Sequence, residues 1–220
     1  MTSLAVAIAR DSRGPTSLYL LTDSRITWAE PTERWDAGSK TFVSPGSADV
    51  FGYYGDAHFM PMALSQVMNL IACGVMDLTA ATAEERHTTM LAQLKNSLGR
   101  ISTKHVLDMT LFHGAREGDG MECKFRLWRS TYKPKLKRWH GEELAIEDRS
   151  YLARVDGAGK PTVEKFEAKA SEKPASGTSR AAINAFCESL DSAAGLLNWW
   201  AFGELDQPDN LDFAGRDAFT

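Results

Sequence analysis

Residues 3–9 read Ser3-Leu4-Ala5-Val6-Ala7-Ile8-Ala9, an alternation that predicts a β-strand. Residues 10–15 follow with Asp, Ser, Gly and Pro, which is the chemistry of a turn. A second apolar run occupies residues 17–21. Two strands joined by a short turn predict a β-hairpin at the start of the chain.

Beyond this hairpin, the remaining chain predicts blocks of strands and blocks of helices. Short strands are expected over 40–43 and 49–54, followed by helices over 57–73 and 82–98. The second helix opens with Thr82-Ala83-Glu84-Glu85, the signature of a capping box. Further elements are expected in the second half of the chain: strands over 105–113, 121–128, 151–155 and 162–168, and a helix over 178–190.

This order favours an α+β fold over an alternating parallel fold. We interpret residues 1–220 as a single domain, with an irregular tail after about residue 206.

Composition narrows the possible functions. The chain has 220 residues, of which 43% are hydrophobic and 25% charged, and a net charge of −4. This balance predicts a globular protein without a general attraction to nucleic acid or anionic membranes. No apolar run approaches the ~20 residues of a membrane helix, and no signal peptide is apparent. The cysteines and histidines show no metal-ligand spacing, so we expect no metal, no cofactor and a cytoplasmic location.

Thr2 directly follows the initiator methionine. If Met1 is removed, one residue carries both a hydroxyl and a free α-amine. A hydroxyl needs an adjacent base to become a good nucleophile, and an N-terminal amine is able to act as that base. Thr2 is therefore a candidate nucleophile, although many proteins begin Met-Thr for no catalytic reason.

Three further motifs follow along the chain. They are Asp23-Ser24-Arg25 after the second strand, Gly38-Ser39-Lys40 before the third, and Gly52-Tyr53-Tyr54-Gly55-Asp56 before the first helix. Each also has a purely structural interpretation. The first is a plausible post-strand turn, Lys40 a plausible strand-edge lysine, and Asp56 a plausible helix N-cap.

Together with Thr2, these motifs resemble the proteasome β-subunit branch of the N-terminal nucleophile (Ntn) hydrolases, which includes the Anbu-type bacterial proteasome homologues. The match in order and spacing covers roughly the first 75 residues. The resemblance implies a four-layer αββα sandwich, in which two antiparallel sheets are flanked by helices.

The resemblance also implies roles for individual residues. Thr2 Oγ would attack a peptide carbonyl, and its own amine would accept the proton. Lys40 would lie beside Thr2 and keep that amine neutral, while Asp23 would hold the Lys40 ammonium. The backbone N–H of Gly55 would bind the oxyanion.

The sequence departs from the family pattern in two places. Asp56 stands where family members often have a second glycine, and its charge would oppose an oxyanion unless it turns away. The family also has a Gly-Ser-Gly turn later in the chain. We favour Ser176-Gly177-Thr178 for this turn, with Gly157-Ala158-Gly159 second, and Asp191-Ser192 for a further supporting pair.

The leading functional hypothesis is a self-compartmentalising threonine peptidase acting on polypeptides. The resemblance implies a homo-oligomeric ring or double ring and a possible AAA+ unfoldase partner. Two alternatives stay open: a non-catalytic ring scaffold or binding protein, and an amidase of the wider Ntn group acting on a small amide. The basic stretch 133–138 is expected to be a solvated hairpin, not a nucleic-acid site.

Overall fold

The computed structural model describes residues 3–27, 34–35, 38–79, 81–102, 104, 106–118, 122–172, 178–194 and 203–205. Their strands form two larger antiparallel sheets and one small ribbon. The first sheet has the order β10-β1-β2-β11: Tyr151–Gly157, Ser3–Asp11, Gly14–Thr22 and Gly203–Leu205. The second has the order β5-β6-β7-β8-β9: Thr41–Val43, Asp49–Tyr54, Met109–Glu117, Lys124–Lys133 and Arg138–Leu144. The ribbon pairs β3 (Ile26–Thr27) with β4 (Arg34–Trp35).

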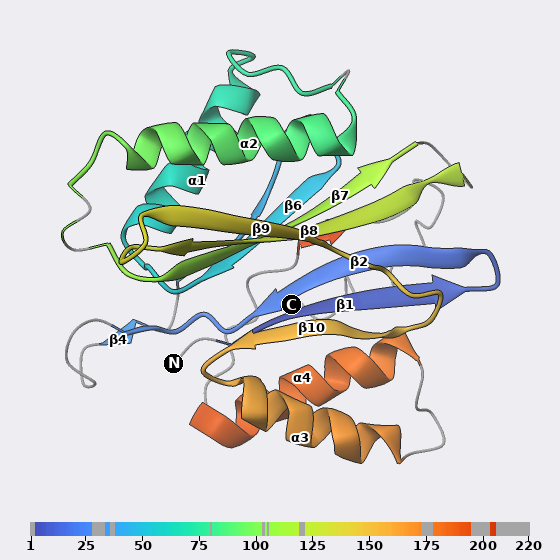
Figure 1. Cartoon of the computed structure of the whole chain (residues 1–220). Helices are drawn as coiled ribbons and strands as arrows, with labels where there is room; N and C mark the ends of the chain where they lie inside the picture. The colour runs from blue at the N-terminus through green and yellow to red at the C-terminus, as the bar shows by residue number, and fades with distance from the viewer. Residues whose placement is uncertain are drawn as a thin grey trace, which may run out of the picture.

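Helices cover the outer face of each sheet, so the predicted αββα sandwich is present (Figure 1). Helices α1 (Phe59–Ala72) and α2 (Ala83–Leu98) lie on the five-stranded sheet. Helices α3 (Lys160–Ser171) and α4 (Ser179–Ala194) lie on the four-stranded sheet. Among the described residues, no helix combines the length and apolarity needed to cross a bilayer.

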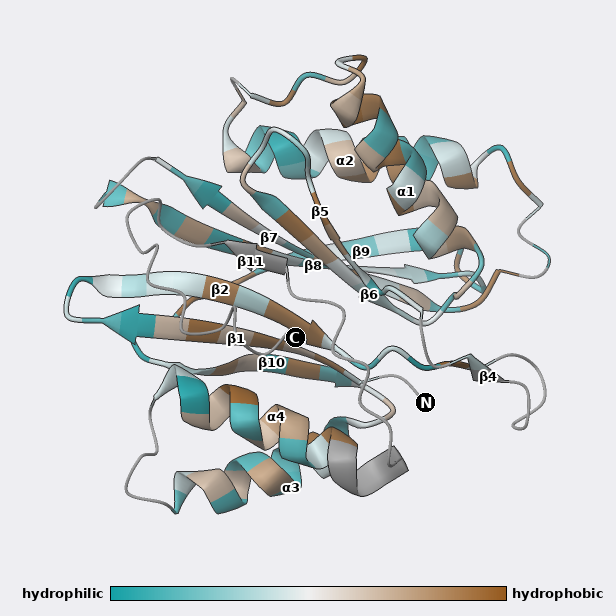
Figure 2. Cartoon of the chain, turned by 180° about the vertical axis from the view of Figure 1, so that it is seen from behind, coloured by the Kyte–Doolittle hydropathy of each residue, from teal (hydrophilic) through white to brown (hydrophobic). Residues whose placement is uncertain are grey.

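Strand β1 is buried on both faces, and it alternates between large and small apolar residues. Leu4, Val6 and Ile8 pack into the layer between the two sheets, against Phe112 of β7. The intervening residues Ala5 and Ala7 face α3 and α4, and their small side chains let the helices approach closely. Figure 2 shows β1 as apolar along most of its length. Burying a Leu, Val or Ile fully contributes about 1.5–3 kcal/mol, so this strand is central to stability.

Several predicted elements agree closely with the structure. The β1–β2 hairpin forms, with Leu4 opposite Thr22. Thr82 caps α2 in a reciprocal capping box with Glu85. The stretch 134–137 is the turn between β8 and β9, as expected for a solvated hairpin.

Other predicted elements were wrong or displaced. Residues 162–168 lie within α3, not in a strand. Pro161 suits the first turn of a helix, and the Glu, Lys and Ala residues that follow are good helix formers. The strand expected over 105–113 begins only at Met109, and the one expected over 121–128 runs from Lys124 to Lys133.

Candidate active site

The register of the β1–β2 hairpin brings Asp23 beside Ser3. The backbone N–H of Asp23 donates to the carbonyl of Ser3 at 3.1 Å. In return, the backbone N–H of Ser3 donates to Oδ2 of the Asp23 carboxylate. Asp23 Oδ1 also accepts from the N–H of Arg25 at 2.9 Å. The carboxylate is therefore fixed directly beside the residue that follows Thr2. Thr2 itself lies outside the described residues.

Lys40 completes this arrangement from the start of β5. Its Nζ donates to Asp23 Oδ1 at 2.7 Å and to the carbonyl of Arg25. The Lys40 side chain is only 3% exposed and that of Asp23 is 16% exposed. A buried ammonium needs a charged partner and hydrogen-bond acceptors, and this one has both. The sequence predicted the Asp23–Lys40 pair, and the structure contains it.

A glycine lies just upstream of Lys40. Gly38 donates its N–H to the carbonyl of Ser24 at 3.0 Å. A Cβ at Gly38 would lie 2.4 Å from Cδ1 of Ile26. A side chain at position 38 would therefore require the Ile26 side chain to move.

Pairing of β5 with β6 places Gly55 near Lys40. Thr41 pairs with Gly52, and the N–H of Tyr53 donates to the Lys40 carbonyl at 3.0 Å. Gly55 follows the end of β6 with φ +104°, a conformation that favours glycine. A small cavity of about 60 Å³ lies here, and its lining includes Arg25, Lys40 and Gly55.

Asp56 is turned away from this cavity. Its side chain is buried, and Oδ1 accepts from the N–H groups of His58 and Phe59 at 2.9 and 2.6 Å. It thus binds the N–H groups at the entry to α1, but the N-cap of this helix is His58, not Asp56 as the alternative interpretation had it. The turn also binds a distant segment, because Asp56 Oδ2 accepts from the N–H of Leu107 at 2.9 Å.

One of the two candidate glycine turns lies beside the start of β1. Ser3 pairs with Gly157, and a Cβ on Gly159 would lie 1.8 Å from Oγ of Ser3. The turn Gly157-Ala158-Gly159, the second candidate for the family's Gly-Ser-Gly turn, therefore contacts the residue after Thr2.

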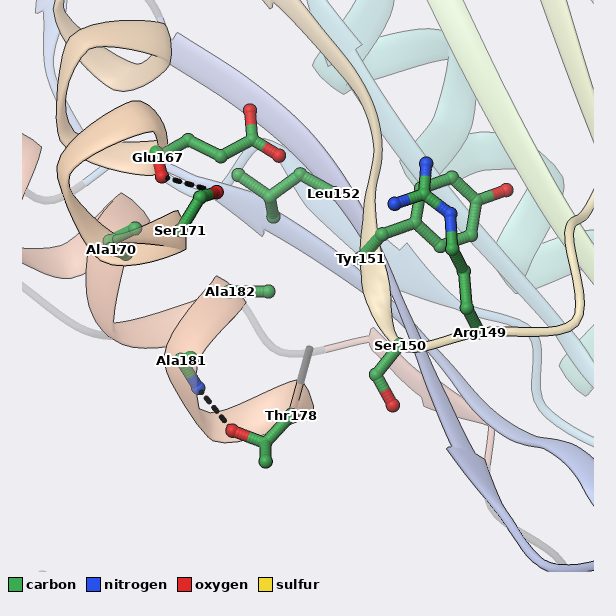
Figure 3. Close-up of a pocket in the computed structure, with 11 residues that line it drawn as sticks. Arg149, Ser150, Tyr151, Leu152, Glu167, Ala170, Ser171, Thr178, Ala181 and Ala182 are labelled. Carbon is green, nitrogen blue, oxygen red and sulfur yellow. Dashed lines mark hydrogen bonds between the residues drawn. The ribbon is translucent and has the colours of Figure 1, made fainter. Parts of the chain in front are cut away.

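Of the favoured turn, the structure describes only Thr178. Ser176 and Gly177 lie outside the described residues. Thr178 caps α4 by accepting from the N–H of Ala181 at 3.1 Å, and it lines a pocket with Ser150 (Figure 3). Ser150 accepts from the N–H of Arg10, at the far end of β1 from Ser3. Asp191 and Ser192 lie in α4, in its last described turn.

Sequence reasoning missed the contacts made by backbone groups. These include the Ser3 N–H bound to Asp23 and the Arg25 carbonyl bound to Lys40. Every residue type has nearly the same backbone donor and acceptor, so these contacts become evident only once the strand register is known. Within the described ranges, no group of three or more His, Cys, Asp or Glu side chains is placed to hold a metal ion.

Comparison with solved structures identifies the fold. Anbu (ancestral beta-subunit) from Yersinia bercovieri superposes with a TM-score of 0.54 over 88% of this chain and 74% of Anbu, at 16% identity. The chain has the proteasome-like Ntn-hydrolase fold. BPH from Thiobacillus denitrificans matches with a TM-score of 0.53 over 95% of this chain and 100% of BPH, at 12% identity. No protein-family model and no curated protein matches the sequence.

Proposed function

We propose that this chain is the subunit of a threonine-type peptidase whose nucleophile is Thr2 after removal of Met1. The observation that carries this proposal is the buried Lys40–Asp23 pair. The carboxylate of that pair also binds the N–H of Ser3, the residue next to Thr2. An ion pair withdrawn from solvent at a strand end is costly to maintain for stability alone, which favours a functional reason for it.

The chemistry follows from the charges and donors of the site. The free α-amine of Thr2 removes the proton from its own Oγ, and Oγ attacks the carbonyl carbon of the substrate. The positive charge of Lys40 disfavours protonation of that amine and therefore keeps it available as a base. The N–H of Gly55 stabilises the tetrahedral oxyanion. In the collapse of this intermediate the protonated α-amine gives its proton to the departing nitrogen, the C–N bond breaks, the amine product is released, and the ester left on Thr2 is then hydrolysed by water.

Assembly into a homo-oligomeric ring or double ring belongs to the same proposal, as do a polypeptide substrate, a cytoplasmic location and an AAA+ unfoldase partner. The shared fold with Anbu and BPH supports the proposal at the level of architecture. Size-exclusion chromatography with light scattering tests the assembly. A mass several times that of one chain is expected.

Peptide hydrolysis by three proteins tests the catalytic part. Wild-type protein should cleave fluorogenic peptides, and Thr2→Ala should abolish cleavage because the hydroxyl is lost. Thr2→Ser keeps a hydroxyl beside the amine and should retain part of the activity. Equal activity of Thr2→Ala and wild type would exclude Thr2 as the nucleophile.

A non-catalytic scaffold or binding role is the second candidate, and one observation favours it. The turn that contacts Ser3 carries Ala158 between its glycines. If this turn is the counterpart of the family's Gly-Ser-Gly turn, the serine that supports the threonine amine is replaced by alanine. If this role is correct, wild-type protein will assemble but cleave no peptide. Thr2→Ala will then assemble as wild type does.

A further inference from the structure

The carboxylate of Asp56 joins two segments that are distant in sequence. Oδ1 accepts from the N–H groups of His58 and Phe59 at the start of α1, and Oδ2 accepts from the N–H of Leu107, 51 residues away. The Asp56 residue is only 3% exposed. Three donors surround the charge and satisfy it, which is what a buried carboxylate requires.

Gly55 is wedged against the segment that Asp56 binds. A Cβ at Gly55 would lie 2.1 Å from the carbonyl oxygen of Asp108 and 2.8 Å from Cα of Met109. The Gly55 backbone therefore packs directly on residues 108–109. The position of that segment determines the space available to Gly55, and hence the direction of its peptide plane.

The 106–108 segment has a second attachment on its other side. The Asp108 carboxylate pairs with Nζ of Lys133, which stands at the end of β8. This pair is half-exposed on both sides, so it contributes little energy by itself. Of these two attachments, the buried Asp56–Leu107 bond is thus the stronger, and it is the one that leads to the Gly55 turn.

We propose that Asp56 is a positioning residue that fixes the orientation of the Gly55 N–H by tying the start of α1 to the 106–108 segment. This inference rests on the proposed function, because the orientation matters only if Gly55 binds an oxyanion. The residue that seemed to oppose an oxyanion would then help to form its binding site. Its negative charge points at three N–H groups and away from the Gly55 cavity.

Asp56→Asn tests the proposal with a minimal change. Asparagine has the same shape but only one accepting oxygen, so it cannot accept from α1 and from Leu107 as the carboxylate does. Oxyanion donors act mainly in the transition state, so their misplacement lowers kcat more than it changes KM. Misplacement by about 1 Å costs on the order of 100-fold. We expect kcat to fall about 10- to 100-fold, with KM within about twofold of wild type.

A second variant reaches the same bond from the other side. Leu107→Pro removes the N–H that Asp56 Oδ2 binds, and Leu107→Ala keeps that N–H while removing the exposed side chain. Leu107→Pro should lower kcat as Asp56→Asn does, and Leu107→Ala should not. The two losses should be less than additive when combined, because both variants break one bond.

Two controls separate positioning from a general loss of stability. Asp77→Asn makes the same substitution at an exposed turn beyond the far end of α1, where the carboxylate accepts from Thr79. Thr82→Ala removes the α2 cap and should cost about 1 kcal/mol of stability. Both should leave kcat within about twofold of wild type.

The outcomes are distinguishable. If wild type cleaves peptides and Asp56→Asn keeps its kcat, or changes only KM, the positioning role is wrong and the proposed function stands. If Asp56→Asn and Thr82→Ala lose kcat equally at equal loss of stability, Asp56 is merely structural. If wild type cleaves no peptide and Thr2 does not react with a covalent peptide epoxyketone probe, the proposed function fails and this inference falls with it.

Discussion

Nζ of Lys40 lies 2.7 Å from Oδ1 of Asp23, in a position where the lysine side chain is almost fully buried. The other oxygen of Asp23 binds the N–H of Ser3. One carboxylate therefore couples the buried ammonium to the backbone of β1, one residue from Thr2. This coupling links β1 of the four-stranded sheet to the residue that precedes β5 of the opposite sheet.

Lys40→Met should abolish most of the activity. Methionine keeps most of the apolar stem and loses the ammonium, so the Thr2 amine would no longer have a cation beside it. Protonation of that amine at neutral pH removes the base, and we expect kcat to fall at least ~100-fold, the scale typical of losing general base catalysis. Steady-state hydrolysis of a fluorogenic peptide measures this.

Lys124→Met is the matched control, because Lys124 is exposed at the start of β8. It should retain wild-type kcat. Unchanged activity of Lys40→Met would show that the buried lysine has no part in the reaction.

Gly55→Ala should destabilise the protein more than Gly46→Ala, although both glycines have positive φ. Gly46 has φ +88°, and a Cβ added there would meet nothing within 4 Å, so alanine adds only backbone strain. That strain is about 1–2 kcal/mol. At Gly55 the Cβ would also collide with the Asp108 carbonyl oxygen at 2.1 Å, which adds roughly 1–3 kcal/mol of overpacking. Urea denaturation of both variants measures the difference, and equal losses would contradict the close contact.

The elements best predicted from sequence are those with a local signal. The alternation in β1 and the capping box at Thr82 are both readable without knowledge of the rest of the fold. The start of β7 was misplaced because Leu107 gives its N–H to the Asp56 carboxylate instead of a neighbouring strand. This contact joins residues that are 51 positions apart, so it cannot be predicted from the local sequence pattern that suggested a strand.

The candidate site was predictable in its residues but not in most of its backbone hydrogen bonds. The resemblance to the proteasome branch of the Ntn hydrolases singled out Asp23, Lys40 and Gly55, and the structure brings Lys40 to Asp23 and to the cavity beside Gly55. The preference for the turn at Ser176 over Gly157-Ala158-Gly159 rested on its place before a helix. Both turns precede helices, so this criterion could not decide between them. The pairing of β10 with β1, which brings Gly157 to Ser3, is long-range.

The free energy of unfolding should fall as the pH drops below about 6.5, and His87 should account for part of this decrease. Burial lowers the pKa of His87 to about 3, and His113, Lys95 and Arg126 act in the same direction, against Glu143. His87 stacks on Trp128, and its Nδ1 lies 3.0 Å from Nδ1 of His113, which is fully buried. The unfolded chain binds a proton near pH 6.5 that the folded chain binds only near pH 3. The free energy of unfolding therefore decreases between these values, by up to about 1.4 kcal/mol per pH unit.

His87→Gln tests this through urea denaturation at several pH values. The variant should show a shallower decline between pH 6.5 and pH 3 than wild type. His140→Gln replaces an exposed histidine on β9 and should keep the wild-type slope. Identical slopes for wild type and His87→Gln would contradict the neutral, buried state of His87.

Whether Thr2 is an N-terminal nucleophile is decided by the intact mass of the purified protein after incubation with a peptide epoxyketone. The ketone of this probe is attacked by a threonine hydroxyl and its epoxide by the α-amine of the same residue, so a stable adduct requires both groups. We expect a chain that lacks Met1 and carries one probe, with no adduct on Thr2→Ala. A chain that retains Met1 and carries no probe would contradict the proposed chemistry.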